Sequence, residues 1–284
     1  MPELSDLLSR REVRLKSFLD GLYFAYSRKE LINPDPLWFL HECGAPDREV
    51  VGLIASSLAY GRVAQIMKSI EFVLSRLGPS PRKFLTEEPE RLRGILGNFK
   101  HRFTTSADME RLLINIASAL SEYGSVEKLM ASCLERANDN LFNALDIFSD
   151  CLSRNEDGAR ASGFSLVTAP RDGSACKRLF LFLKWMVRHD DVDPGGWTVI
   201  SPRRLIMPTD THIHAISLRL GLTKRKQADL KAAVEITGAL ARLCPDDPTR
   251  YDFVLTRFGI RDGLSVDELT RLAEAGTSPA GKGA

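Results

Sequence analysis

Cysteine is scarce in this chain, and the few cysteines are far apart. The five cysteines among 284 residues are separated by 90, 18, 25 and 68 positions. No pair forms a Cys-x-x-Cys clip, and no set has the spacing of a zinc or iron–sulfur site. We therefore expect reduced thiols, no bound metal, no iron–sulfur cluster and no cofactor.

Long apolar runs and glycine-rich loops are also missing. No window of about 18 apolar residues occurs anywhere, which argues against a membrane-spanning helix. The N-terminal segment MPELSDLLSRREVR is charged and lacks the apolar stretch of a secretion signal. No glycine-rich phosphate loop and no internal repeat is present. These absences predict a cytoplasmic protein with no membrane association.

The composition that remains is that of an ordinary globular protein. With 44% hydrophobic and 27% charged residues, the chain can bury a core without disulfides or metals. The net charge is only +2, but residues 171–231 carry 12 Lys or Arg against 6 Asp. A locally basic stretch in a near-neutral protein suits a surface that faces a polyanion. Solvated helix faces would produce the same pattern, so charge alone does not decide.

Helical periodicity dominates the sequence. Apolar residues recur at helical steps from Leu4 to Leu22 and from Val50 to Val73. No convincing run of alternating strand residues occurs, so we predict an all-α fold. Further helices are predicted over about 106–122, 125–152, 175–188, 211–220, 226–243, 247–259 and 265–275.

Proline and glycine mark the connections between these helices. The segments 33–36 and 78–81 contain prolines that interrupt regular structure. The stretch 189–208 is longer than an ordinary connection, so we expect it to be functional or partly structured. The tail 277–284 is expected to be disordered.

Lys177 is the first candidate for chemistry. The turn at Gly173 and Ser174 precedes a nearly all-round apolar helix, so residues 179–187 should be buried and Lys177 should lie in the first helical turn. The positive end of the helix dipole and the adjacent Arg178 disfavour the ammonium form of this lysine. A neutral amine is what a Schiff-base nucleophile requires. A solvated lysine at a helix start would have the same local sequence.

Asp210 is the second candidate, because it directly precedes an amphipathic helix. As an N-cap it would satisfy free backbone N–H groups. As a carboxylate beside Lys177 it would stabilise a developing cation, orient the nucleophile and shuttle protons. Both roles are compatible, since a capping residue is held rigidly. His212 and His214 lack a third ligand nearby, so we expect His212 to form hydrogen bonds rather than bind a metal.

Several of these strings carry a resemblance to known families. The segment Gly173-Ser-Ala-Cys-Lys177 with its apolar helix, followed by Pro208-Thr-Asp-Thr-His212 and Arg219-Leu-Gly-Leu222, resembles the helix-hairpin-helix DNA glycosylase superfamily, which includes endonuclease III and the 8-oxoguanine DNA glycosylases. The C-terminal iron–sulfur cysteines of the endonuclease III branch are absent, so the 8-oxoguanine branch is the nearer analogy.

Residues 31–260 resemble more closely the bacterial DUF2400 family. Its hallmark strings are similar to Leu58-Ala-Tyr-Gly-Arg62, Lys177-Arg-Leu-x-x-Phe-Leu-x-Trp-Met-Val-Arg188, Asp193-Pro-Gly, Asp210-Thr-His and Tyr251-Asp-Phe.

The glycosylase resemblance implies a two-lobed helix-hairpin-helix fold. Residues 1–46 together with 178–276 would form a terminal helical lobe, and residues 47–177 a central lobe that ends in the hairpin. The protein would be a monomer that binds duplex DNA with a flipped base, in the nucleoid of a bacterial cell. The implied function is a DNA base-excision glycosylase with AP lyase activity, acting on a damaged base such as an oxidised purine.

The same resemblance assigns roles to individual residues. Lys177 matches the Schiff-base nucleophile, and Asp210 matches the essential aspartate. Lys184, two helical turns further on, is a substitute nucleophile. For stacking on a flipped base, Trp197 in its polar loop is favoured over Trp185. The candidates for substrate or DNA contact are Gly173, Ser174, Trp185, Trp197, His212, Arg178, Tyr60, Arg62, Lys224 and Arg225.

Two departures from the superfamily pattern leave other functions open. Ala175 replaces the second hairpin glycine, which limits close approach of the backbone to a DNA phosphate. Lys177 and Asp210 lie 33 residues apart, a long separation caused by the loop 190–205. A non-catalytic nucleic-acid-binding module that keeps the fold is one alternative. An enzyme that acts on RNA or on another nucleoside is a second.

Overall fold

The protein is mostly helical. The computed structural model describes residues 8–155, 157–161, 163–258, 267, 269 and 271. This part of the chain contains twelve α-helices and one antiparallel hairpin of two short strands. None of its helices has the length and apolar character needed to cross a membrane. The predicted tail 277–284 and most of the helix predicted over 265–275 lie outside the described residues.

The helices are α1 (Arg10–Tyr26), α2 (Trp38–Glu42), α3 (Arg48–Ser57), α4 (Val63–Leu77), α5 (Pro81–Glu87), α6 (Ser106–Tyr123), α7 (Val126–Arg136), α8 (Leu141–Leu152), α9 (Lys177–Val187), α10 (Thr211–Leu220), α11 (Leu230–Leu243) and α12 (Asp252–Arg257). The strands are β1 (Lys100–His101) and β2 (Thr104–Thr105).

Polar side chains explain where several helices begin. Thr105 accepts a hydrogen bond from the N–H of Asp108, and the Asp108 carboxylate accepts one from the Thr105 N–H, so α6 starts with a capping box. Helix α11 begins at Leu230 rather than at 226, because the Asp229 carboxylate accepts from the N–H of Ala232 and caps the helix there.

The apolar stretch 50–73 forms two helices where its periodicity predicted one. Helix α3 ends before Leu58, and the chain turns at Gly61, whose φ is +104°. A Cβ atom at Gly61 would lie 2.9 Å from Cδ of Arg102. The positive φ favours glycine at this position, and the turn around it separates α3 from α4.

The stretch 125–152 is also divided, into α7 and α8. Asn138 and Asp139 between them have φ angles of +49° and +60°. Such angles interrupt a helix, and asparagine and aspartate tolerate them better than most residues. The side chain of Asn140 then accepts a hydrogen bond from the N–H of Asn143 and starts α8.

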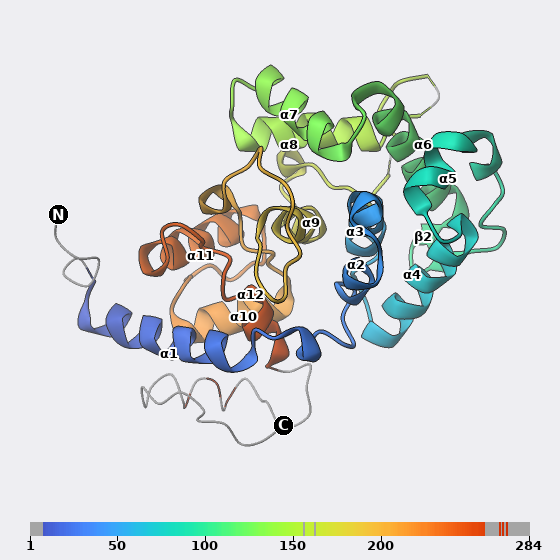
Figure 1. Cartoon of the computed structure of the whole chain (residues 1–284). Coiled ribbons are helices and arrows are strands. Elements are labelled where there is room, and N and C mark those ends of the chain that lie inside the picture. The colour runs from blue at the N-terminus through green and yellow to red at the C-terminus, as the bar shows by residue number, and fades with distance from the viewer. Residues whose placement is uncertain are drawn as a thin grey trace.

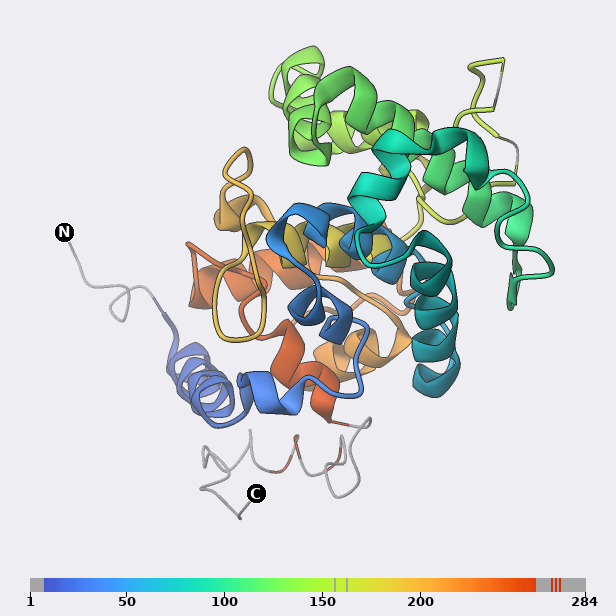
Figure 2. The ribbon, with the colours of Figure 1, turned by 45° about the vertical axis from the view of Figure 1, so that its right-hand side comes forward.

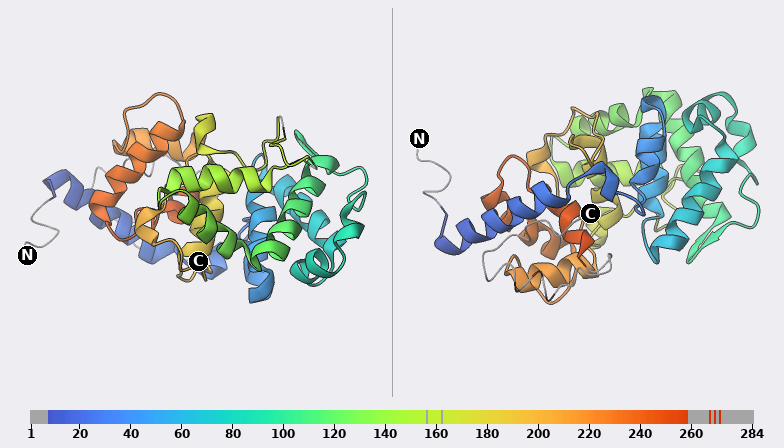
Figure 3. Two further views of the ribbon diagram at one scale, coloured as in Figure 1. Left: turned by 90° about the horizontal axis from the view of Figure 1, so that it is seen from above. Right: turned by 60° about the horizontal axis from the view of Figure 1, so that its bottom comes forward.

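Helix α9 lies near the centre of the molecule. Helix α3 packs along it, with α4 to α8 on one side and α1 with α10 to α12 on the other (Figures 1 and 2). Both views of Figure 3 show α1 and α11 toward one end of the molecule and α4 and α5 at the other. Gly52 of α3 allows close packing, since a Cβ there would lie 3.0 Å from Cε of Met186. Residues 179–187 are buried as predicted, except Leu181, which is half-buried. The lobe boundaries at 46/47 and 177/178 stay a prediction.

The long connection after α9 is partly structured, as expected. The backbone N–H groups of Gly195 and Trp197 donate to the carbonyl oxygens of Trp185 and Met186, at 3.0 and 2.8 Å. A 3-10 turn follows at Pro202–Arg204. These hydrogen bonds hold residues 195–197 of the loop against the C-terminal turn of α9.

Candidate active site

Lys177 is the first residue of α9, and a left-handed turn precedes it. Gly173 and Cys176 have φ angles of +75° and +47°. The hydroxyl of Ser174 accepts a hydrogen bond from the Cys176 N–H at 3.3 Å. The amine of Lys177 donates to the carbonyl oxygen of Ala59 at 3.5 Å. The turn thus places Lys177 in the first helical turn, as the sequence predicted, and directs its amine toward the end of α3.

Asp210 caps α10 and at the same time faces Lys177. Its Oδ1 atom accepts hydrogen bonds from the backbone N–H groups of His212 and Ile213, both at 2.9 Å. Its Oδ2 atom lies 3.2 Å from the Lys177 amine. Each oxygen therefore has one of the two predicted roles: Oδ1 caps α10, and Oδ2 forms the ion pair with Lys177.

The Asp210 carboxylate is charged in this arrangement. Burial would raise its pKa, but the Lys177 ammonium and the backbone N–H of Ile213 outweigh burial and hold the pKa below its ordinary value. The charged carboxylate oxygen Oδ2 lies within reach of a proton from the Lys177 amine. A lysine must release a proton before its amine can attack a substrate.

The pair lies in the wall of a cavity of about 620 Å³. A cavity of this volume is in the range that holds small molecules or single nucleotides. The predicted candidates that line it are Lys177, Asp210, Tyr60, Ser174, Arg178, Trp185 and His212.

The cavity also has a buried charged wall, in which Lys184 is the central residue. The Lys184 side chain is 1% exposed, and its amine lies 2.9 Å from Asp193 and 3.3 Å from Asp252. Burial disfavours the ammonium form, but the two carboxylates outweigh burial and raise the pKa of Lys184. An ammonium held between two carboxylates is a hydrogen-bond donor, which makes Lys184 a poor substitute for Lys177 as nucleophile.

Asp252, the first residue of α12, completes this wall. Its Oδ2 atom faces Lys184, whereas its Oδ1 atom is buried and has no hydrogen-bond partner in the described part of the chain. Burial and the nearby Asp193 raise the pKa of Asp252 even though Lys184 acts in the opposite direction. Leaving a buried carboxyl oxygen without a partner costs free energy, which agrees with the raised pKa of Asp252.

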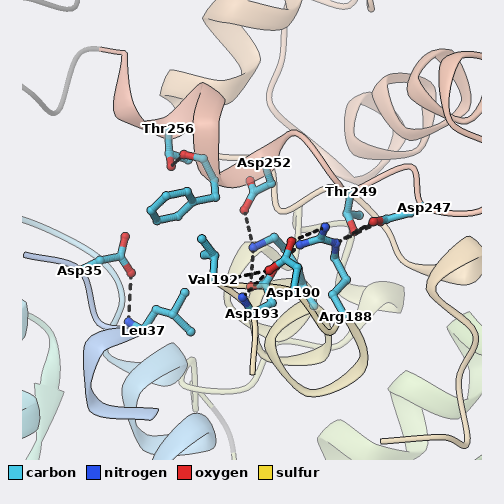
Figure 4. A network of polar contacts seen from close by, with 12 residues as sticks. Asp35, Leu37, Arg188, Asp190, Val192, Asp193, Asp247, Thr249, Asp252 and Thr256 are labelled. Carbon is cyan, nitrogen blue, oxygen red and sulfur yellow. Dashed lines mark hydrogen bonds and ion pairs between the residues drawn. The ribbon is translucent and has the colours of Figure 1, made fainter. Parts of the chain in front are cut away.

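Figure 4 shows the charged network behind the buried wall, around Arg188. The guanidinium of Arg188 contacts three carboxylates, those of Asp190, Asp193 and Asp247. Asp193 therefore accepts from both Arg188 and Lys184. This network connects the end of α9 and the following loop to the start of α12, and it fixes the position of Lys184.

Tyr60 and Arg178 also line the cavity and contact each other. The guanidinium carbon of Arg178 lies 4.8 Å from the centre of the Tyr60 ring, and one of its N–H groups donates to the carbonyl oxygen of Ser57 at 2.9 Å. His212 lines the cavity as well, and its Nε2 atom has no hydrogen-bond partner among the described residues. These contacts bring together an aromatic face, a cation and an imidazole around the lysine.

Trp197 lies elsewhere, in the core. Its indole N–H donates to Glu49 at 2.8 Å, and its ring packs edge-on against Phe182. The structure thus gives Trp197 a packing role, against the expectation that it stacks on a flipped base. Trp185 is the tryptophan that lines the cavity, although it is almost fully buried.

The remaining predicted residues do not line this cavity. Arg62 is exposed at the start of α4, and Gly173 lies in the turn that precedes Lys177. Arg225 pairs with Asp229 at 3.0 Å, and the backbone N–H of Lys224 donates to Glu235. In the described ranges, no group of three or more His, Cys, Asp or Glu side chains is arranged to hold a metal ion.

Asp252 and Asp193 are the functional candidates that the sequence analysis missed. Both occur in strings that carried the family resemblance, Tyr251-Asp-Phe and Asp193-Pro-Gly. A single aspartate in the apolar run 251–255 was the available signal, because an acid in such a run is buried and requires a partner. Its partner, Lys184, lies 68 positions earlier, and only the fold shows the contact.

The fold and the site together define a helical protein with a lysine–aspartate pair in the wall of a cavity. The family described as "Protein of unknown function (DUF2400)" matches residues 35–261. The chain therefore belongs to the DUF2400 family, and the matched segment contains Lys177, Asp210 and Asp252. Comparisons with curated proteins and with solved structures gave no match.

Proposed function

We propose that this protein is a DNA base-excision glycosylase with AP lyase activity, in which Lys177 is the nucleophile. The observation that carries the proposal is the 3.2 Å contact between the Lys177 amine and Asp210 at the wall of a nucleotide-sized cavity. The resemblance of the segments around both residues to helix-hairpin-helix DNA glycosylases supports it. Duplex DNA with one extruded nucleotide is the proposed substrate.

The proposed reaction begins when Lys177 transfers a proton to Asp210 Oδ2. The free amine attacks the C1′ carbon of the extruded nucleotide, and the bond from C1′ to the base breaks with its electron pair going to the base. Asp210 passes the proton that it received from Lys177 to the departing base. The carboxylate that this transfer restores then stabilises the positive charge at C1′ and accepts the proton that the attached amine releases. The sugar ring then opens to a Schiff base with Lys177, from which loss of the C2′ proton expels the 3′ phosphate.

The buried wall supplies recognition in this proposal. Enzymes that extrude a base read its polar edge through hydrogen bonds inside the pocket. Lys184 offers a donor, and the partnerless Oδ1 atom of Asp252 offers an acceptor, or a donor when the carboxyl is protonated. A base with adjacent acceptor and donor groups, such as an oxidised purine, fits this pair.

Borohydride trapping tests the chemistry. The purified protein is incubated with duplexes that contain 8-oxoguanine, an oxidised pyrimidine, uracil or an abasic site, and the covalent adduct is measured after reduction. We expect an adduct on at least one duplex that is lost in Lys177→Gln and strongly reduced in Asp210→Asn. Lys83→Gln is the matched control, because Lys83 is an exposed lysine on α5.

The other outcomes identify the alternatives. Absence of adduct and of base release on every duplex, together with salt-sensitive DNA binding, would overturn the proposal in favour of a non-catalytic binding module. Tighter binding to RNA than to duplex DNA would point to a different nucleic-acid substrate. An adduct that persists in Lys177→Gln would assign the nucleophile to another residue.

A further inference from the structure

Phe103 is an apolar side chain with no partner in the core. Among the described residues it is the most exposed large hydrophobic side chain, at 80%. It lies at the tip of the hairpin between β1 and β2, next to Arg102, whose φ is +53°. Exposing a phenylalanine at a turn contributes nothing to the fold, so this position suggests contact with another molecule.

The hairpin is held firmly against the wall of the Lys177 cavity. The Tyr60 hydroxyl donates to the carbonyl oxygen of His101 at 2.8 Å and lies 2.7 Å from the Thr104 hydroxyl. The two ring nitrogens of the buried His101 bond to the Ser69 hydroxyl at 2.8 Å and the Tyr60 carbonyl at 3.0 Å. Because Tyr60 also lines the cavity, the tip that carries Phe103 has a fixed position relative to Lys177.

The surroundings of Phe103 are basic. The guanidinium carbon of Arg102 lies 5.6 Å from the centre of the Phe103 ring and 6.0 Å from that of Tyr60. Lys100 and Arg102 are exposed, and the nearby Asp108 carboxylate is engaged by the N–H and hydroxyl of Thr105 and by the pair with Arg111. An apolar tip between cations is complementary to stacked bases flanked by phosphates.

We propose that the β1–β2 hairpin inserts the Phe103 ring into a DNA duplex, at the base step left empty by the nucleotide that enters the Lys177 cavity. The proposal builds on the proposed function, since it requires an extruded nucleotide. Phe103 acts as a positioning residue: its ring stacks on the exposed bases and prevents the nucleotide from returning, while Arg102 and Lys100 contact the backbone phosphates.

The test uses a short duplex with one tetrahydrofuran abasic analogue and a 2-aminopurine opposite it. We expect the wild-type protein to bind this duplex and to change the 2-aminopurine fluorescence. Phe103→Ala should bind about tenfold more weakly or worse and lose the fluorescence change, and Phe103→Trp should restore both. Phe24→Ala is the matched control, because Phe24 on α1 is 71% exposed and lies far along the chain from the hairpin.

The outcomes separate this inference from the proposed chemistry. Equal affinity and equal fluorescence for wild type and Phe103→Ala would overturn insertion, even if Lys177 forms a trapped adduct. A fluorescence change that depends on Phe103 without any borohydride adduct would support insertion and reject the lyase. Because Phe103 is exposed, its variants should melt at the wild-type temperature, so a lower melting temperature in Phe103→Ala would also count against a role confined to DNA contact.

Discussion

At the scale of single residues, Asp210 shows how one side chain serves structure and chemistry together. Its Oδ1 atom accepts from the His212 and Ile213 N–H groups, and its Oδ2 atom faces Lys177. The helix fixes the carboxylate, so no side-chain rearrangement is needed when a substrate arrives. The two functions are separable by substitution, because asparagine caps a helix as well as aspartate does.

We therefore predict different effects for two substitutions of Asp210. Asp210→Asn keeps the cap and loses only the charge that faces Lys177, so its free energy of unfolding should fall less than that of Asp210→Ala. Asp210→Ala should unfold about 1 kcal/mol more easily, because the first N–H groups of α10 lose their acceptor. Both variants should lose most of the trapped adduct, since both remove the charge that faces Lys177. Urea denaturation and borohydride trapping measure the two effects, and full adduct in Asp210→Asn would contradict the assignment.

At the scale of elements, the loop after α9 is held by charge. The Asp190 carboxylate accepts from the backbone N–H groups of Val192 and Asp193 at 2.9 and 2.7 Å, and from the Tyr23 hydroxyl at 2.8 Å. Arg188 contacts the same carboxylate at 2.9 Å. One aspartate thus connects the loop to α1 and to the end of α9.

This arrangement predicts a pH dependence of stability. Burial would raise the pKa of Asp190, but Arg188 and the backbone N–H donors lower it from 3.8 to about 2. A depressed pKa contributes stability that is present above pH 4 and lost as the pH falls from about 4 to 2. Asp190→Asn should therefore be about 2 kcal/mol less stable at pH 7, and this difference should vanish near pH 2. Thermal or urea unfolding against pH measures it.

The exposed Asp246 provides the control for this experiment. Its pair with Arg203 lies at the surface, so Asp246→Asn should leave the pH profile unchanged within about 0.5 kcal/mol. A profile for Asp190→Asn that runs parallel to that of wild type from pH 7 to 2 would show that Asp190 does not stabilise the fold through its charge.

Elements with a single periodic face were the ones that the sequence predicted well. The predicted helix 211–220 coincides with α10, because Asp210 caps its start and Gly221, with φ of +71°, ends it. The apolar pattern continues on both sides of Gly61, so it predicted one helix where the structure has two, separated by a turn in which Gly61 has a positive φ. The strands of the hairpin have two residues each, too few for an alternating pattern to be recognised.

At the scale of the whole molecule, contacts between distant segments determine the site. Lys177 and Asp210 were identifiable because each stands at the start of a helix. The pairing of Lys184 with Asp252 and the attachment of the hairpin to Tyr60 were not, since they depend on how α9, α12 and the hairpin pack. The position of the charges also depends on the fold. The net charge of +2 does not indicate a DNA-binding face, whereas the exposed cations around Arg102 indicate where the DNA backbone would bind.

If the DNA backbone binds near Arg102, the affinity for duplex DNA should depend on salt concentration through the cations of this surface. Each phosphate contact adds about one unit to the slope of log Kd against log salt concentration, because binding releases a counterion. Arg62 is exposed beside Gly61, where the chain passes Arg102. Arg62→Gln should therefore weaken duplex binding for every sequence and reduce the slope by about 1.

The exposed Lys83 on α5 again serves as the control, because it already pairs with Glu87 at 3.8 Å. Lys83→Gln should leave the slope unchanged, and fluorescence-anisotropy titrations over a range of salt concentrations measure both variants. A slope for Arg62→Gln equal to that of wild type would place the phosphate backbone on another face. The predicted cluster at Lys224 and Arg225 would then be the surface to test next, since Arg225 is partly neutralised by Asp229 whereas the Lys224 side chain is exposed.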